Sequence, residues 1–405
     1  MNYKEALDWL YATQNFGIKL GLDAPKRLLR EYLAFPPRTT KVAHVAGSNG
    51  KGSTCAILDS IARATGMKTG LFTSPHLVDF RERMRVNGQM ISEEETAEHI
   101  TAIKELVKDW EHHPTFFELT LVIAMRHFRN AGCELIILET GMGGRLDATT
   151  AVPADMHVIT PVAMDHSQWL GDTIEKIAAE KAGIITSDAP VISSKQIPAA
   201  LGIIAEKANE MQAPLTVITD PIEGYSLSLL GSYQKENAAV ALEAAHQLGF
   251  TLRYDTVKHA LMNVKWQGRF EVVSENPLIV IDGAHNPHAA GILAKTWEEN
   301  FSGIKPTIIY GAVESKDLDG VCEHLAKISD TFVFTPIDSP RSVQFSDIST
   351  LNALKEATLY NKNDIQESLT FAKEYGSAIL ITGSLYLLGE YKAFISNASH
   401  HPTSQ

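Results

Sequence analysis

Short apolar runs alternate with stretches of helical periodicity along most of the chain. Four of these runs lie in the first half, at residues 42–46, 69–73, 133–138 and 156–160. Continuous apolar runs of this length, separated by helical segments, are typical of strands buried on both faces of a mainly parallel sheet. The pattern therefore predicts an α/β fold.

A second series of apolar runs follows residues 266–269. Its strands are expected at residues 278–281, 307–310, 331–334 and 378–381, with helices between them. This alternation predicts a small Rossmann-like α/β unit. No GxGxxG sequence follows any of these strands, which argues against a bound dinucleotide.

The length of 405 residues exceeds one ordinary hydrophobic core, so we expect two domains. We place the larger domain at residues 1–270 and the smaller at 271–405. Within the larger one, Asp172 and Glu175 are expected to cap a helix that runs through Lys181.

Charge and composition exclude several functional classes. The formal net charge is −12, and no cluster of lysine and arginine offsets it, so nucleic acid is not an expected partner. No segment has the apolar length that a membrane span needs. The three cysteines are Cys55, Cys133 and Cys322; they are scattered and form no CxxC pair, which favours reduced thiols. We expect a cytoplasmic protein without a membrane partner.

A glycine-rich segment between the strand at residues 42–46 and the following helix is the chief clue to chemistry. Glycines let backbone N–H groups face an anion, the helix N-terminus adds positive potential, and a lysine can reach outer phosphates. The segment departs from GxxxxGK[ST], which disfavours a plain kinase or GTPase. The alternative is a turn without a ligand. The phosphate-binding residues are expected to be Gly47, Ser48, Asn49, Gly50, Lys51, Gly52 and Ser53.

Three polar residues follow other predicted strands and form a candidate magnesium site. They are Ser74, Glu139 and His166. Each has a structural alternative: a turn before proline, a backbone cap, and a hydrogen-bonded loop histidine. If the strands are neighbours, however, the side chains converge above the phosphate loop, and magnesium takes oxygen ligands with occasional imidazole.

These motifs, taken in order, closely resemble the folylpolyglutamate synthase and dihydrofolate synthase family within the Mur-ligase-like amide synthetases. The resemblance covers nearly the whole chain. The shared motifs are GIKLGL at 17–22, AHVAGSNGKGST at 43–54, TSPHL at 73–77, LETGMGGRLDAT at 138–149, Asp165-His166, EKAGI at 180–184, WQGRFE at 266–271, DGAHNP at 282–287 and TGSLYL at 382–387. Departures from the family pattern occur at Thr150, Tyr233 and Ser315.

The resemblance implies a ligase that joins L-glutamate to a folate, to dihydropteroate, or to both, and splits ATP to ADP and phosphate. A carboxylate is a poor electrophile, so the γ-phosphoryl group would first be moved onto it, and Mg²⁺ and Lys51 would stabilise the charge. We expect the protein to act as a monomer, with an ATP-binding first domain and a glutamate ligase second domain.

The same resemblance assigns roles to individual residues. Lys51, Lys181 and His285 would be catalytic, and Lys181 would be carbamylated and join the magnesium ligands. Asn237, Arg269 and Asp282 would contact the nucleotide, Phe117 and Asp147 the pterin, and His285 and Ser384 the incoming glutamate. Structural alternatives exist for Phe117, which lies in an apolar helix, and for Lys181, which suits the C-terminal end of a helix.

Two other functions stay open at this point. A Mur-type ligase acting on a cell-wall precursor would share the loop and the magnesium site, but it would need a further domain for its UDP-linked substrate, and little chain precedes Lys41. A nucleotide-dependent regulatory protein would bind ATP without ligating glutamate. It would not need Arg269, Asp282 and His285.

Overall fold

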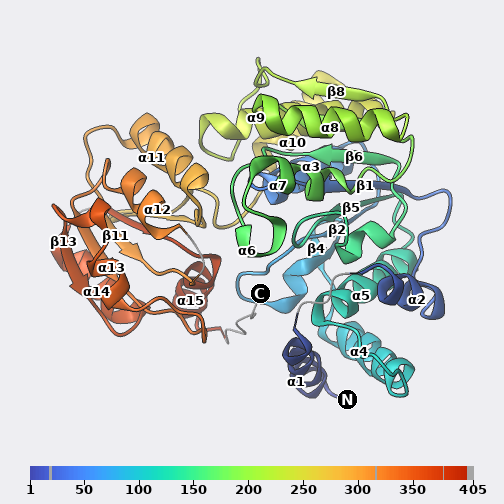
Figure 1. The fold of residues 1–405 in the computed structure, drawn as a ribbon, viewed down its shortest axis with the longest axis horizontal. Helices are drawn as coiled ribbons and strands as arrows, with labels where there is room; N and C mark the ends of the chain where they lie inside the picture. Colours follow the sequence, from blue (N-terminus) through green and yellow to red (C-terminus); the bar gives the residue numbers. More distant parts are fainter. Residues whose placement is uncertain (18–20, 315–316, 377, 399–405) are drawn as a thin grey trace.

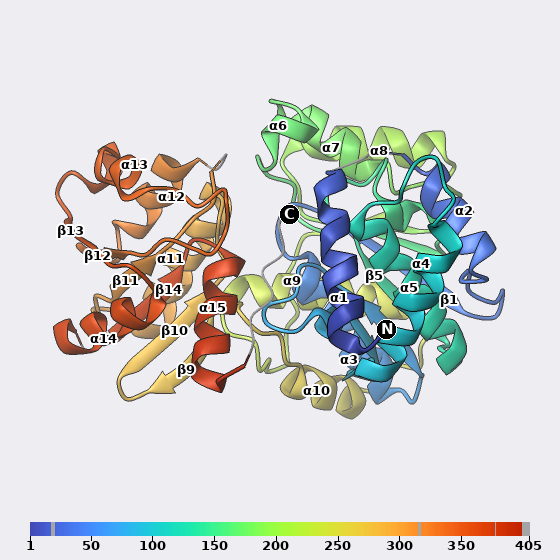
Figure 2. The same ribbon diagram turned by 90° about the horizontal axis from the view of Figure 1, so that it is seen from below.

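The computed structural model describes residues 1–17, 21–314, 317–376 and 378–398. Residues 18–20 of the GIKLGL motif and Ser315 lie outside the described residues. The described chain contains two sheets, each with its own helices, and these lie side by side in Figures 1 and 2.

The first sheet has eight strands in the order β4-β3-β2-β5-β1-β6-β7-β8. All pairs from β2 to β8 are parallel, and only the β3–β4 hairpin and its pairing with β2 are antiparallel. The mainly parallel sheet predicted from the apolar runs is therefore confirmed. The strands are β1 Lys41–Ala46, β2 Thr69–Phe72, β3 Met84–Val86, β4 Gln89–Met90, β5 Leu135–Glu139, β6 Met156–Ile159, β7 Val191–Ser194 and β8 Leu215–Ile218.

Helices cover both faces of this sheet. Successive residues of a strand point to opposite faces. Thus Val42 of β1 packs with one group of helices, whereas Ala43 and Val45 pack with another. The first group is α1 Tyr3–Ala12, α2 Asp23–Glu31, α4 Glu93–Val107 and α5 Phe116–Ala131. The second is α3 Lys51–Ala64, α9 Ser232–Gln247 and α10 Tyr254–Asn263. The helices α7 Ile174–Ala182 and α8 Pro198–Glu210 pack near β6 and β7.

The second sheet has six strands in the order β13-β12-β11-β14-β10-β9, and only the β9–β10 pair is antiparallel. Its strands are β9 Glu271–Glu275, β10 Leu278–Asp282, β11 Thr307–Tyr310, β12 Thr331–Phe334, β13 Thr358–Asn361 and β14 Ala378–Thr382. Its helices are α11 Pro287–Phe301, α12 Leu318–Leu325, α13 Phe345–Ser349, α14 Ile365–Tyr375 and α15 Leu385–Ser396. All four strands expected in this part of the chain are present.

Short elements complete the fold. They are the four-residue helix α6 Ser167–Leu170 and the 3₁₀ helices η1 Thr13–Phe16, η2 Phe80–Arg83, η3 Ala148–Ala151 and η4 Asn352–Leu354. Within the described ranges, no helix combines the length and the apolar character needed to cross a membrane.

One predicted helix cap is wrong. Helix α7 is capped by Thr173, whose side chain accepts a hydrogen bond from the Lys176 backbone N–H. Asp172 lies one position too early and instead pairs with Lys176 at 2.7 Å. The helix ends with Gly183 as its C-cap, so Lys181 lies in its last turn as expected.

Candidate active site

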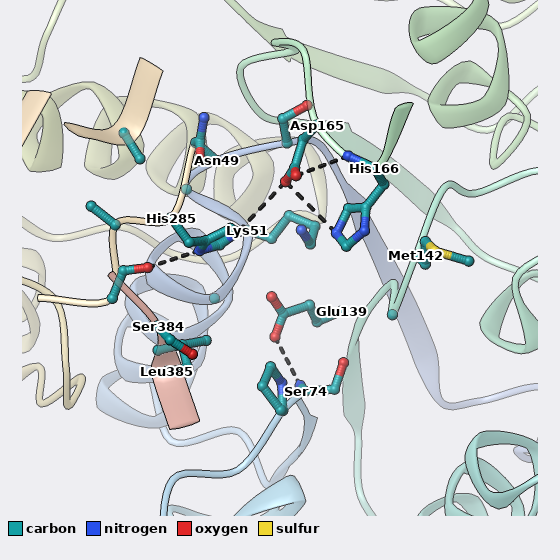
Figure 3. A pocket seen from close by; sticks show the side chains of 18 of the residues that line it. Asn49, Lys51, Ser74, Glu139, Met142, Asp165, His166, His285, Ser384 and Leu385 are labelled. Carbon is teal, nitrogen blue, oxygen red and sulfur yellow. Dashed lines mark hydrogen bonds and ion pairs between the residues drawn. The ribbon is translucent and has the colours of Figure 1, made fainter. Parts of the chain in front are cut away.

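One cavity of about 620 Å³ is lined by residues that follow the strands of both sheets. Ligands of parallel α/β sheets bind at this carboxyl edge. We call the residues after β1, β2, β5 and β6 the first wall, and the residues after β10, β11, β12 and β14 the second wall. Lys51, Ser74, Glu139 and His166 lie on the first wall, and His285 and Ser384 lie on the second (Figure 3).

The phosphate loop follows β1 and requires glycine at two positions. A Cβ atom on Gly47 would lie 1.9 Å from Thr160 Oγ1, and one on Gly50 would lie 2.6 Å from Asn237 Oδ1. Gly50 also has a φ of 86°, a conformation that side chains disfavour. The loop is therefore packed tightly between β6 and helix α9, and this places Asn237 beside it.

Two lysine side chains converge on the loop. Lys51 Nζ donates to the Gly47 carbonyl at 3.1 Å, and Lys181 Nζ donates to the same oxygen at 2.9 Å. Lys181 is buried, and burial together with the nearby Lys51 ammonium lowers its pKa to about 7. A buried amine with this pKa is partly neutral near pH 7.

Two backbone amides of the phosphate loop have an acceptor within the protein. The backbone N–H groups of Ser48 and Asn49 donate to the Pro161 carbonyl, at 2.9 Å and 3.2 Å, and both residues line the cavity. The Ser48 hydroxyl is likewise bound to the Ala163 backbone. The first turn of α3 has no side-chain cap, so its N–H groups, from Lys51 onward, remain as donors for an anion.

The candidate magnesium ligands come from neighbouring strands. Strands β2 and β5 pair in parallel, and the Ser74 backbone N–H donates to Glu139 Oε2 at 3.1 Å. Burial raises the pKa of Glu139, and the Lys51 ammonium opposes this rise. The Glu139 carboxylate and the Ser74 hydroxyl line the cavity with the His166 side chain, which lies across from them (Figure 3). Oxygen donors with one imidazole suit a magnesium ion.

Asp165 connects the two walls. Its Oδ2 atom lies 3.7 Å from His166 Nε2 on the first wall and 3.5 Å from His285 Nε2 on the second. Asn286 Nδ2 also donates to this oxygen at 3.4 Å. His285 in turn is oriented by a 2.8 Å contact between its Nδ1 and the Gly283 carbonyl. The carboxylate thus holds a histidine from each wall (Figure 3).

The expected nucleotide contacts beyond the loop lie at the junction of the two sheets. Asn237 and Arg269 line the cavity, and so does Asp282, the last residue of β10. The Asp282 carboxylate accepts hydrogen bonds from the Phe270 and Ala284 backbone N–H groups, both at 2.8 Å. Burial raises its pKa, and the nearby Arg269 guanidinium opposes the rise. Asp282 therefore fixes the start of the second wall.

Ser384 lies at the end of β14, next to β10 in the sheet. It is the N-cap of α15, and its hydroxyl accepts a hydrogen bond from the Tyr386 backbone N–H at 3.1 Å. Ser384 and His285 therefore follow adjacent parallel strands, and both line the cavity.

The two expected pterin residues differ in whether the side chain is engaged in hydrogen bonds within the protein. Phe117 is half-buried, lines the cavity and packs on Phe72, with a ring-centroid distance of 5.7 Å. Asp147 is buried, and its carboxylate accepts three backbone hydrogen bonds of 3.0 Å, from Gly141, Met142 and Thr149. Asp147 therefore shapes the loop after β5, while Phe117 presents an aromatic surface to the cavity.

The sequence did not assign several cavity residues. Thr115 and Glu118 line the cavity and form a capping box at the start of α5. The sequence contains this pattern, but the pattern alone predicts only where a helix begins. Asn49 Nδ2 lies 2.9 Å from His288 Nδ1, and Asn286 Nδ2 donates to Asn49 Oδ1 at 3.1 Å. These contacts join the phosphate loop to the second wall, and only the three-dimensional structure reveals them.

Two domain families match the chain. Residues 45–192 match the Mur ligase middle domain, and residues 268–385 match the Mur ligase glutamate ligase domain. The first match contains the phosphate loop and the candidate magnesium ligands. The second begins just before β9 and contains the second wall.

Full-length relatives agree with these matches. The dihydrofolate synthase/folylpolyglutamate synthase of Bacillus subtilis is 31% identical, over 96% of this chain and 98% of its own length. The structure of E. coli FolC in complex with DHPP and ADP superposes with a TM-score of 0.86 at 31% identity, covering 97% of this chain and 98% of that one. A bifunctional folylpolyglutamate synthase/dihydrofolate synthase with Mn, AMPPNP and L-glutamate bound also gives 0.86, at 30% identity, covering 96% and 98%. The chain therefore belongs to the folylpolyglutamate synthase and dihydrofolate synthase family of Mur-type ligases.

Proposed function

We propose that the protein is an ATP-dependent ligase that joins L-glutamate to the carboxylate of a folate or of dihydropteroate, and releases ADP and phosphate. The observation that carries this proposal is the single cavity that the phosphate loop shares with His285 and Ser384 on the second wall. Such a cavity can hold a triphosphate next to a carboxylate and an amine. Relatives named for both activities match the chain over almost its full length.

The chemistry divides into two displacements. An oxygen of the acceptor carboxylate attacks the γ-phosphorus, the bond to the bridging oxygen breaks, and ADP leaves. The glutamate amine then attacks the acyl carbon, the carbon–oxygen bond breaks, phosphate leaves, and the amine loses its proton. Lys51, whose side chain lines the cavity, would stabilise charge on the phosphoryl group as it transfers. Closure of the two walls would exclude water from the acyl phosphate.

A magnesium ion fits the first wall. We propose Ser74, Glu139 and His166 as its protein ligands, because a carboxylate, a hydroxyl and an imidazole from three strand ends line the same cavity and face one another across it. The ion would neutralise charge on the phosphate oxygens. Homologous structures contain Mn with AMPPNP, which supports a divalent ion at such a site.

We propose further that Lys181 is carbamylated in the active protein. Its amine is buried beside Lys51, and both donate to the Gly47 carbonyl. Two ammonium groups near a divalent ion would repel it. Carbon dioxide reacts with a neutral amine to give a carbamate and a proton, and the lowered pKa of about 7 supplies that neutral amine. The product reverses the charge and offers oxygen atoms to magnesium.

The acceptor site is proposed at the Phe117 side of the cavity, where Thr115 and Glu118 also lie. An aromatic face beside polar groups suits a pterin ring. Arg269 and Asp282, at the start of the second wall, and Asn237 are proposed to contact the nucleotide. His285 and Ser384 are proposed to lie near the incoming glutamate.

We infer that the two domains, residues 1–270 and 271–405, form one monomeric enzyme of the cytoplasm. Its three cysteines are free and buried, which supports a reducing compartment. The complete cavity within one chain supports a monomer. Light scattering of the purified protein tests the oligomeric state.

The proposal is tested by supplying purified protein with magnesium, ATP and glutamate, and with dihydropteroate and tetrahydrofolate in separate reactions. Mass spectrometry is expected to show an acceptor extended by glutamate in at least one reaction. Glutamate-independent ATP turnover without such a product would favour a regulatory protein instead. Neither that alternative nor a cell-wall ligase is favoured, because the matching relatives are folylpolyglutamate and dihydrofolate synthases.

A further inference from the structure

Arg341 lines the cavity on the second wall, far from any motif of the sequence. It follows β12, whereas Val313 follows β11, Ser384 follows β14 and His285 follows β10. These four strands are consecutive neighbours in the order β12-β11-β14-β10 and run in parallel. Their carboxyl ends therefore place Arg341, Ser384 and His285 along one edge of the sheet.

The backbone around Arg341 is held firmly. The Glu314 N–H donates to the Arg341 carbonyl at 2.8 Å, and Val313 forms an antiparallel bridge with Ser342. The Ser342 hydroxyl accepts a hydrogen bond from the Ile337 N–H at 3.0 Å. The position of Arg341 is thus fixed by β11 and does not depend on its own side chain.

Within the described part of the chain, the Arg341 guanidinium has no counter-charge. Among residues 1–17, 21–314, 317–376 and 378–398, no carboxylate forms an ion pair with it, and only its backbone takes part in hydrogen bonds. By contrast, Arg145 pairs with Glu180 at 2.8 Å, and Lys392 pairs with Glu271. A half-buried, unpaired guanidinium in a cavity is a binding group for a carboxylate or a phosphate.

We propose that Arg341 binds the side-chain carboxylate of the incoming L-glutamate and selects for it. This inference rests on the proposed ligase function. The phosphate loop contacts the residues that follow β10, because Asn49 Nδ2 lies 2.9 Å from His288 Nδ1 and Asn49 accepts a hydrogen bond from Asn286. Arg341 follows β12, three strands from β10, and so lies at the end of the site away from the loop. The anion expected at the Arg341 end of the site is therefore the side-chain carboxylate of glutamate.

The dimensions of the sheet support the side-chain carboxylate over the α-carboxylate. Three strand spacings separate β12 from β10, roughly 14 Å at about 4.8 Å each. The glutamate amine must reach the acyl group near the phosphate loop, and the α-carboxylate stays beside the amine. The side-chain carboxylate lies two methylene groups farther away and can extend along the edge, past Ser384, to meet the arginine.

The test compares Arg341→Met and Arg341→Lys with the wild-type protein, and uses Lys305→Met as a control. Lys305 lies on the same half of the chain, is 67% exposed and pairs with Asp330 at the surface. Initial rates of ADP formation are measured while glutamate, ATP and acceptor are varied in turn. L-Glutamine replaces glutamate in a parallel series, and thermal unfolding checks the fold.

Arg341→Met is expected to raise the KM for glutamate about 100-fold, the scale for removing one partner of a charged pair. The KM values for ATP and acceptor and the Tm are expected to be unchanged. The preference for glutamate over glutamine should fall in the same variant. Arg341→Lys should recover part of the affinity, because it keeps the charge without the two-pronged geometry.

Two results would overturn the inference while the proposed function stands. One is a glutamate KM within twofold of wild type in Arg341→Met, and the other is a rise in the KM for ATP or acceptor instead. If the wild-type protein itself shows no glutamate-dependent turnover, the proposed function fails and the inference fails with it.

Discussion

The two walls of the cavity are held in different ways. On the first wall, functional side chains contact the backbone of loops at the strand ends: Lys51 donates to the Gly47 carbonyl, and Glu139 accepts from the Ser74 N–H. The buried Lys181 of α7 donates to the same Gly47 carbonyl. On the second wall, His285 and Ser384 each contact backbone within two residues of themselves, at Gly283 and Tyr386. The first wall is therefore held by contacts between neighbouring strand ends, whereas His285 and Ser384 are oriented by their own turns.

This difference matches the ligands proposed for each wall. The first wall is proposed to bind the same triphosphate and magnesium in every turnover, and stabilising their charge requires donors in fixed positions. The acceptor and amino acid enter, react and leave, so we expect the second wall to move relative to the first. Beside the phosphate loop, side-chain contacts link Asn49 and Asp165 of the first wall to residues 285, 286 and 288 of the second.

The first prediction removes the charge of the first wall. Lys51→Ala is expected to lower turnover by about 10³-fold, because the lysine stabilises charge that grows in the transition state. Among the described residues its side chain hydrogen-bonds only to the Gly47 carbonyl, so the Tm should be unchanged. Lys176→Ala, at a 62% exposed lysine, is the matched control. Near-normal turnover in Lys51→Ala would remove the loop from the mechanism.

The second prediction concerns the modified lysine. Lys181→Ala is expected to lower ligation by about 10²-fold, the scale for loss of one preorganised group, and short carboxylic acids should restore part of it. Carbon-13 NMR with labelled bicarbonate should show a carbamate on the wild-type protein and none on the variant. Burial lowers the pKa to about 7, so the neutral amine forms as pH rises through 7, and labelling should increase over that range. Labelling that is equal in both proteins would contradict the assignment.

The third prediction concerns a buried histidine of β6, the strand that leads to His166 on the first wall. His157 is fully buried, and burial lowers its pKa to about 4 from 6.5. The unfolded chain binds a proton below pH 6.5 that the folded chain does not, so stability falls as pH decreases from 6.5 toward 4. Between pH 6.5 and 5 the loss is expected to be about 2 kcal/mol.

His157→Gln removes this titration and should weaken the acid dependence of the free energy of unfolding. Urea unfolding at pH 6.5 and 5 measures it for both proteins. An identical acid dependence in the two would show that His157 does not titrate as inferred.

The fourth prediction weakens the link between the walls. Asn49→Ala removes hydrogen bonds to Asn286 and His288, and is expected to lower kcat/KM for ATP about tenfold, the scale of one to two neutral hydrogen bonds. Small-angle scattering should show compaction of the wild-type protein with ATP and acceptor, and less of it in the variant. Asn263→Ala is the control, since Asn263 bonds only within α10. Equal compaction in both would argue against this link.

The sequence was sufficient for the features that depend on neighbouring residues. Apolar runs gave the strands, and glycine spacing gave the phosphate loop between β1 and α3, because local periodicity and turn chemistry decide both. A one-residue error arose at α7, where Asp172 and Thr173 are both good caps and only the backbone geometry chooses Thr173.

Contacts between distant segments could not be derived in this way. Asn49 and Asn286 lie 237 residues apart, and their contact depends on how the two sheets meet. The turn of the Ser48 and Asn49 amides toward Pro161 depends on the loop after β6. Arg341 belongs to no motif, and only the strand order places it in the cavity.

The central claim is that the acceptor carboxylate first takes the γ-phosphoryl group from ATP bound at the first wall. The glutamate amine, held at the second wall, then attacks the resulting acyl phosphate. An acceptor labelled with oxygen-18 in its carboxylate tests this most directly. Phosphate released during ligation is expected to carry one labelled oxygen for each amide formed, because the attacking oxygen leaves with the phosphate. Amide formation with unlabelled phosphate would contradict the account.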